Sequence, residues 1–247
     1  MKQLSPDYAV SLQACGGERL LIDSADGAMD CYRFAPDASG LPVIFYCDAG
    51  GLRPGMFEMA RTLADFGHGA LMPNLYHRLG DYAPFDPATV FSDPDEHARL
   101  MTMAAGLSVA EAMRDTQACL DYLDAAQVGA LGYCLGGKLA LSAAGHFATI
   151  MAAASIHGGA LATDAPDSPH RLVAQMPGRL YIAVAGIDPY FTPEEQARLC
   201  ASLDQAGTDY TLALYPEAQH GFAVADMPVF EPASAARHWR QVQAFFQ

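Results

Sequence analysis

The segment GYCLGG at residues 132–137 places one cysteine among glycines, where a buried strand is expected to turn sharply into a helix. Such a turn strains its central residue, and glycines surround it because side chains there would collide with neighbouring backbone. The sulfur of Cys134 would project beyond the strand, near the positive end of the helix dipole that stabilises a thiolate. The pattern predicts a nucleophile elbow with cysteine in place of serine. The alternatives are a buried cysteine in a glycine-rich turn and a nucleotide-binding loop.

A thiol nucleophile needs a base, and the base needs an acid that orients it. Asp188 follows a strand expected at 180–185, and His220 follows a strand expected at 210–215. His220 could accept the thiol proton or pair with the thiolate, while Asp188 would hold the imidazole tautomer. The order Cys134, Asp188, His220 is that of a hydrolase with a nucleophile elbow. The alternative is a turn-forming aspartate and a solvated histidine.

Another histidine, His157, also follows an expected strand, at 151–156, and is a candidate pocket-lining residue. Weaker candidates are His68, His97 and His238, which occupy helical or polar contexts.

Alternating strand and helix patterns must position these residues. Two β-rich runs joined by an Asp-Gly turn predict a hairpin over residues 18–34. The run 42–47, a loop, a helix at 56–66 and a strand at 69–73 predict a parallel βαβ unit. The later elements are expected as strands at 128–133, 151–156, 180–185 and 210–215, and helices at 108–126, 135–146, 193–205 and 233–246. We therefore predict a doubly wound, mostly parallel sheet with an antiparallel start and helices on both faces.

Residues 79–96 show no sustained periodicity and contain three prolines. We interpret the region as a surface excursion over 79–105 that could cap a pocket, within one domain spanning 1–247. The helix that follows begins with Ser108 and Glu111 in the spacing of a capping box. On its apolar face Cys119 is expected to pack in the core.

Composition excludes several classes of function. The 247 residues carry 28 Asp and Glu against 14 Lys and Arg, so the formal net charge is −14 and nucleic acid is not an expected partner. No apolar run approaches the ~20 residues of a membrane span. The start MKQLSPD reaches proline and aspartate before any apolar core of a signal peptide. The six cysteines form no Cys-x-x-Cys and no paired spacing with histidines, so we expect neither disulfides nor a metal site, and a cytoplasmic location.

Taken together, four segments resemble the dienelactone hydrolase family of α/β-hydrolase enzymes, and the resemblance covers most of the chain. The segments are LGYCLGG at 131–137, NLYHR at 74–78, GIDPYFTP at 186–193 and HGF at 220–222. The resemblance implies an α/β-hydrolase fold with Cys134, Asp188 and His220 as the triad. It also implies an oxyanion hole made by the backbone N–H groups of Leu135 and Ala49.

Two residues near the expected nucleophile are assigned through the resemblance or by position alone. Asp48 stands where the family has a glutamate that interacts with the resting thiol, and its side chain is one methylene shorter. Tyr82, with Phe85 and Phe91, could shape the acyl pocket or could equally be packing for the excursion.

The family holds its substrate carboxylate with two arginines, and Arg78 matches the first. The second is missing, because residues 221–224 read GFAV, unless Arg53 supplies a cation from elsewhere. A lone arginine is weaker support for an acidic substrate than a bidentate pair. The alternative for Arg78 is a structural salt bridge to an acid such as Asp81 or Asp86.

The leading hypothesis is a cysteine-dependent hydrolase that cleaves a lactone or small activated ester through an acyl-thioester, with no cofactor. A broader carboxylesterase or thioesterase on the same triad is the nearest alternative. A non-catalytic ligand-binding module that retains the fold represents a different class. A nucleotide-binding oxidoreductase is disfavoured because the loop DAGG at 48–51 lacks the Gly-x-Gly-x-x-Gly pattern. The expected partner is a small-molecule substrate, and the protein is expected to be a monomer or homodimer.

Overall fold

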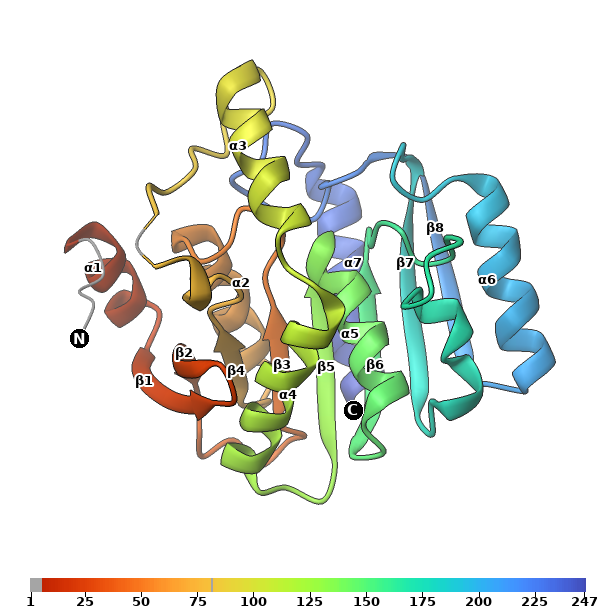
Figure 1. The fold of residues 1–247 in the computed structure, drawn as a ribbon, viewed down its shortest axis with the longest axis horizontal. Coiled ribbons are helices and arrows are strands. Elements are labelled where there is room, and N and C mark those ends of the chain that lie inside the picture. The colour runs from red at the N-terminus through yellow and green to blue at the C-terminus, as the bar shows by residue number, and fades with distance from the viewer. Residues whose placement is uncertain (1–5, 81) are drawn as a thin grey trace.

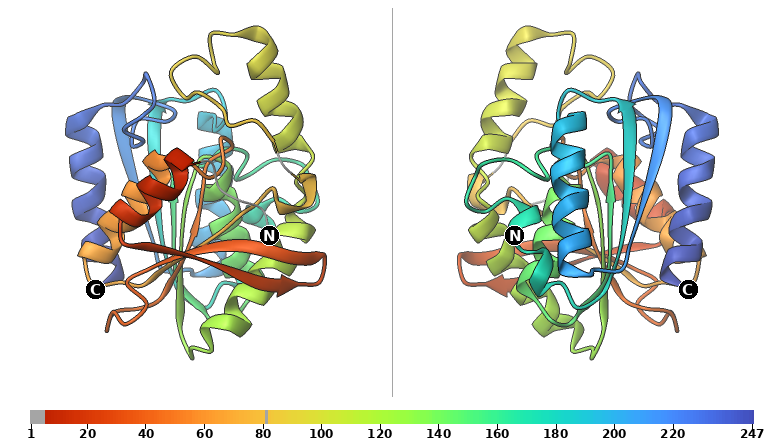
Figure 2. Two further views of the ribbon diagram at one scale, coloured as in Figure 1. Left: turned by 90° about the vertical axis from the view of Figure 1, so that its left-hand side faces the viewer. Right: turned by 90° about the vertical axis from the view of Figure 1, so that its right-hand side faces the viewer.

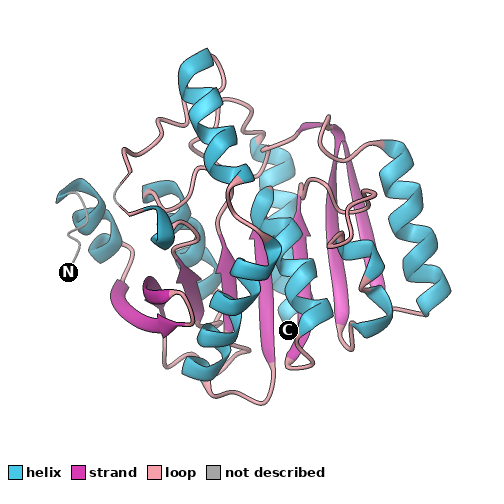
Figure 3. Ribbon diagram, viewed as in Figure 1, coloured by secondary structure: helices cyan, strands magenta, loops and turns pink. Residues whose placement is uncertain are grey.

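One open sheet organises the protein in the computed structural model, which describes residues 6–80 and 82–247 (Figure 1, Figure 3). Within these residues the sheet has eight strands in the order β1-β2-β4-β3-β5-β6-β7-β8. The strands are β1 (Gly17–Ser24), β2 (Gly27–Phe34), β3 (Val43–Tyr46), β4 (Ala70–Pro73), β5 (Val128–Tyr133), β6 (Ile150–Ile156), β7 (Arg179–Ile187) and β8 (Tyr210–Gln219).

The sheet is antiparallel only at its start. β1 pairs with β2 through the expected hairpin, and β2 runs antiparallel to β4. From β4 through β3 and on to β8, each neighbouring pair is parallel. Every residue of β3, β4 and β5 is buried, as parallel strands covered on both faces require. The predicted fold class is confirmed.

Helices form the outer layers (Figure 2). They are α1 (Pro6–Ala14), α2 (Pro54–Asp65), α3 (Pro94–Ala105), α4 (Val109–Leu123), α5 (Leu135–His146), α6 (Pro193–Ala206) and α7 (Pro232–Phe246). Three short 3-10 turns lie at His77–Leu79, Pro169–Arg171 and Val173–Gln175. One hydrophobic cluster packs α4, α5 and α6 against one face of the sheet, and a second packs α1, α2 and α7 against the other. None of the helices in the described ranges is long and apolar enough to cross a membrane.

Helix α3 was not expected from the sequence, and neither was α1. Leu100 is the buried residue of α3, so the helix has no apolar stripe that periodicity could reveal. Its start is nevertheless encoded locally, because the Asp93 carboxylate accepts hydrogen bonds from two backbone N–H groups and Pro94 occupies the first turn. The helix stands beyond the carboxyl ends of the central strands (Figure 1).

Helix α4 begins at the predicted capping box. Ser108 Oγ accepts a hydrogen bond from the N–H of Glu111 at 3.2 Å, and Glu111 Oε2 accepts from the N–H of Ser108 at 3.0 Å. Cys119 is fully buried in the cluster between α4 and the sheet. Both expectations are confirmed, and the box fixes where the chain leaves the excursion.

The capping box gives a stability prediction. Ser108→Ala removes the acceptor for an orphan N–H and should lower the free energy of unfolding by about 1 kcal/mol. Ser202→Ala is the matched control, because its hydroxyl bonds to the Arg198 carbonyl within α6 and caps nothing, so the change should stay within about 0.5 kcal/mol. Urea denaturation measures both, and equal effects would contradict the capping role.

Candidate active site

The chemistry-bearing residues gather where four neighbouring strands end. Cys134 follows β5, His157 follows β6, Asp188 follows β7 and His220 follows β8. The backbone N–H groups of Cys134, His157 and His220 each donate to a carbonyl of the adjacent strand, at 3.1, 2.8 and 3.1 Å. The sheet therefore extends its hydrogen bonding into the site and fixes the positions of these three residues.

Cys134 occupies a strained backbone conformation with φ 53° and ψ −115°. A Cβ on Gly132 would collide with the carbonyl of Gly136, and a Cβ on Gly136 would collide with the carbonyl of Tyr46. Close approach of strand, turn and helix thus requires these two glycines. The chain adopts the sharp strand-to-helix turn that the glycine spacing predicted, with the half-buried Cys134 at its apex.

Asp188 and His220 form a direct pair. His220 Nδ1 lies 2.9 Å from Asp188 Oδ2, and the other carboxylate oxygen accepts the Tyr190 N–H at 2.8 Å. The side chains are 1% and 12% exposed, so the pair is shielded from water. β7 and β8 extend beyond their predicted ends until Ile187 pairs with Gln219, and this pairing brings the two following residues together.

The His220 imidazole is held in its charged form. Burial by itself would lower its pKa, but the electrostatic interaction with Cys134 and the bond to Asp188 outweigh burial and raise the pKa to about 10. Nε2 is buried and completes no hydrogen bond with any described residue. The interaction of His220 with Cys134 is the one that an imidazolium–thiolate ion pair would produce.

His157 lies beneath His220 and lines the same cavity, as expected. The two rings meet at 5.1 Å in an edge-on arrangement, while Tyr190 covers His220 at 4.8 Å. His157 is 1% exposed, and neither ring nitrogen has a hydrogen-bond partner within the described ranges. Burial, reinforced by the neighbouring histidines, holds the pKa of His157 well below its usual value, so the ring is neutral. The His220 ring thus contacts two other rings of the site.

The two backbone N–H groups that the sequence predicts as an oxyanion hole have no hydrogen-bond partner among the described residues. Ala49 lies in the loop after β3, and Leu135 begins α5 directly after the elbow. Neither N–H donates a hydrogen bond to another described residue. The Tyr76 hydroxyl donates to the Ala49 carbonyl at 2.8 Å and fixes the loop. Ala49 and Cys134 line the same cavity, because β3 pairs with β5.

A cavity of about 590 Å³ opens onto Cys134 and His220. Its walls are mostly apolar, and the excursion supplies a large share of them. The apolar lining residues are Phe85, Pro87, Val90, Phe91, Leu100, Ile187, Pro189, Tyr190, Met227, Pro228 and Val229. Residues of 79–105 thus contribute directly to the space in front of the cysteine.

Asp48 is directed toward Arg53. Both carboxylate oxygens bind the guanidinium, at 2.7 and 2.8 Å, and one also accepts the Gly50 N–H. Arg53 binds Asp226 as well, at 2.8 and 3.1 Å, and the Gly51 carbonyl at 3.3 Å. These contacts use all five N–H donors of the guanidinium. Asp48 lines the cavity, but its carboxylate is committed to a buried ion pair and makes no hydrogen bond to the thiol.

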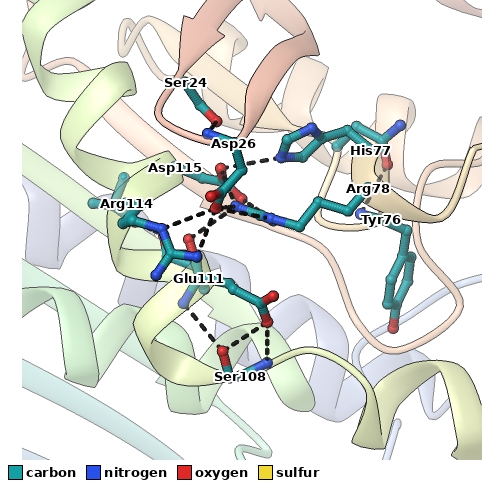
Figure 4. A network of polar contacts seen from close by, with 12 residues as sticks. Ser24, Asp26, Tyr76, His77, Arg78, Ser108, Glu111, Arg114 and Asp115 are labelled. Carbon is teal, nitrogen blue, oxygen red and sulfur yellow. Dashed lines mark hydrogen bonds and ion pairs between the residues drawn. The ribbon is translucent and has the colours of Figure 1, made fainter.

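The structure does not bring Arg78 into the cavity. Its guanidinium binds the buried Asp115 at 2.7 and 2.8 Å and Asp26 at 2.6 Å (Figure 4). The salt-bridge alternative therefore describes its environment, with partners other than those expected: Asp81 lies outside the described residues, and the Asp86 carboxylate caps its own turn.

Tyr82 is likewise not among the cavity-lining residues. It packs edge-on against Tyr76 at 5.8 Å, close to Gly51 of the loop after β3.

The role of Asp226 was not predicted from the sequence, because nothing local marks an aspartate as the partner of an arginine 173 positions away. No group of three or more His, Cys, Asp or Glu in the described ranges could hold a metal ion.

Comparison with known proteins places the chain in one family. A family model described as "Dienelactone hydrolase family" matches residues 29–247. A carboxymethylenebutenolidase of Rhodococcus opacus is 27% identical over 216 residues, which cover 85% of this chain and 81% of the relative. The one from Pseudomonas sp. (strain P51) is 29% identical over 187 residues, 74% of each chain. A candidate dienelactone hydrolase from Klebsiella pneumoniae subsp. pneumoniae MGH 78578 shares the fold, with TM-score 0.79, 21% identity and coverage of 93% and 97%.

The ion pair gives a titration prediction. In the wild type, the His220 imidazole should remain protonated at neutral pH and titrate near its raised pKa of about 10. Cys134→Ala removes the largest contribution that raises this pKa, so the titration should fall toward the ordinary value of 6.5. Long-range ¹H–¹⁵N NMR measures it. His238, whose pKa burial lowers to about 3, is the internal control and should stay neutral in both proteins. An unchanged His220 titration would disprove the ion pair.

Arg78 gives a second stability prediction. Arg78→Ala leaves the buried Asp115 with His77 alone and should lower the free energy of unfolding by about 3 kcal/mol. Arg114→Ala is the control, because this arginine is 43% exposed and binds Asp26 at the surface, so its loss should cost less than about 1 kcal/mol. A stable Arg78→Ala protein with weakened binding of anionic esters alone would instead assign Arg78 to the substrate.

Proposed function

The chain belongs to the dienelactone hydrolase family and is a hydrolase of ester bonds, and we propose that Cys134 is its nucleophile. The observation that carries this proposal is the shielded pair of Asp188 and His220 beside a cysteine on a strained elbow. The substrate is a lactone or other small activated ester, and the reaction passes through an acyl-thioester.

Acylation begins from the thiolate and the imidazolium. The Cys134 sulfur attacks the ester carbonyl, and the N–H groups of Leu135 and Ala49 bind the oxyanion that forms. When the intermediate collapses, the carbon–oxygen bond of the ester breaks and His220 donates its Nε2 proton to the departing alkoxide. In a lactone, this alkoxide remains tethered to the acyl group.

Deacylation reverses the roles. Neutral His220 accepts a proton from water at Nε2, and the resulting hydroxide attacks the thioester carbonyl. The carbon–sulfur bond breaks, the carboxylic acid leaves, and the thiolate and imidazolium are restored. Asp188 keeps Nδ1 protonated in both half-reactions, so that Nε2 always faces the reacting atoms. The strained elbow and the sheet supply the remaining geometry.

Three further assignments complete the proposal. Residues 79–105 act as a cap, because Phe85, Val90 and Leu100 form an apolar cluster over the cavity. The chain works as one domain. It acts in the cytoplasm, where a reducing compartment keeps a nucleophilic thiol free, and all six cysteines are unpaired. A non-catalytic module is less well supported, since binding alone would not need the acid, the base and the free N–H donors together.

Substitution of the nucleophile tests the proposal. Cys134→Ala should lower the rate of p-nitrophenyl ester hydrolysis by roughly a thousandfold or more. Iodoacetamide should inactivate the wild type with one adduct on Cys134, located by peptide mass spectrometry. Cys200→Ala is the control, because Cys200 is half-buried like Cys134 but lies on α6. Full activity in Cys134→Ala would refute the mechanism.

A further inference from the structure

Among the described residues that line the cavity, Arg53 and His220 can carry a positive charge, and each is already paired with an aspartate. We propose that this site takes neutral, apolar esters or lactones and discriminates against substrates that carry a carboxylate, an inference that rests on the proposed function. Three features of the site carry it: the saturation of Arg53, the balance of charge around the cavity, and the apolar lining.

Among the described residues that line the cavity, Arg53 is the only lysine or arginine. Its guanidinium is 3% exposed and donates every N–H to Asp48, Asp226 or the Gly51 carbonyl. A substrate carboxylate could bind Arg53 only by displacing one of these partners. The displaced aspartate would then remain buried without its counter-charge, which is strongly unfavourable.

The fixed charges around the cavity are negative in sum. Arg53 carries one positive charge, whereas Asp48 and Asp226 together carry two negative charges. Asp188 is paired with His220. The whole chain carries a formal charge of −14. An anionic substrate would therefore be repelled on approach, and no arginine or lysine of the described lining is free to replace the water around its carboxylate.

The lining is suited to an apolar acyl group. Phe85, Val90 and Leu100 are nearly completely buried at the cap, while Phe91 and Ile187 are 51% and 56% exposed and lie at the cavity wall. The Arg99 guanidinium stacks on the Phe85 ring at 3.7 Å and is also paired with Glu96, so it supports the wall. A cavity of about 590 Å³ has room for a substrate larger than a short acyl chain.

A matched pair of substrates tests the inference. p-Nitrophenyl hexanoate and the mono-p-nitrophenyl ester of adipic acid share a leaving group and acyl length, and differ in a terminal carboxylate. The wild type should show a kcat/KM for the neutral ester about tenfold or more above that for the anionic ester, because the carboxylate loses water without gaining a partner. Their spontaneous hydrolysis rates correct for intrinsic reactivity.

Two pairs of variants test the reason for the discrimination. Asp226→Asn removes a charge that neutralises Arg53 and should raise the ratio of anionic to neutral kcat/KM about fivefold. Asp209→Asn makes the same change in an exposed loop before β8, at the opposite end of this strand from His220, and should leave the ratio unchanged. Should Asp226→Asn fail to fold, Val229→Lys places a cation at the cavity wall and should raise the ratio, whereas Val229→Met should not.

The outcomes separate the two proposals. Equal or better hydrolysis of the anionic ester by the wild type would overturn the inference and leave the cysteine mechanism in place. A ratio that does not respond to Asp226→Asn or Val229→Lys would also overturn it. Absence of Cys134-dependent hydrolysis of both esters would instead overturn the proposed function, and the inference with it.

Discussion

The site depends on one constraint: the His220 imidazole must lie close enough to Cys134 to interact with its sulfur. His220 follows the edge strand β8, whereas Cys134 follows β5, and two strands lie between them. At the usual strand spacing, the two strand ends are about 14 Å apart. Several contacts set the position of the His220 ring across this distance. β7 and β8 extend and pair up to it, the Asp188 carboxylate binds Nδ1, and the rings of His157 and Tyr190 pack against it.

This constraint explains an otherwise unfavourable residue. His157 is buried with two unsatisfied nitrogens at a positive φ of 39°. Its ring fills the space below His220 at the end of β6, the strand nearest to Cys134 on the path between them. Burial keeps the pKa of His157 low, so it adds no positive charge beside His220. The local cost is thus tied to the position of His220, the base in the proposed mechanism.

Arg53 performs a comparable structural task on the other side of the cysteine. By binding Asp48 and Asp226, it joins the loop that carries Ala49 to the segment that follows His220. The two backbone regions that flank the substrate are thereby held at a fixed separation. The same contacts use up the guanidinium, so rigidity of the site and recognition of an anion compete for one side chain.

The sequence by itself determined the elbow, the capping box, the strand order along the chain and the residues that follow the strands. These features depend on glycine sterics, helix ends and hydrophobic periodicity, all of which act over a few neighbouring positions. It did not predict α3, because the helix face is largely solvated and only its start is marked, by Asp93 and Pro94, and it left open the environments of Arg78 and Asp48. Both environments depend on partners: Asp26 and Asp115 bind Arg78, and Arg53 binds Asp48. Only the tertiary structure chose among the many acids of this chain, because an ion pair depends on distance in space rather than on position in the sequence.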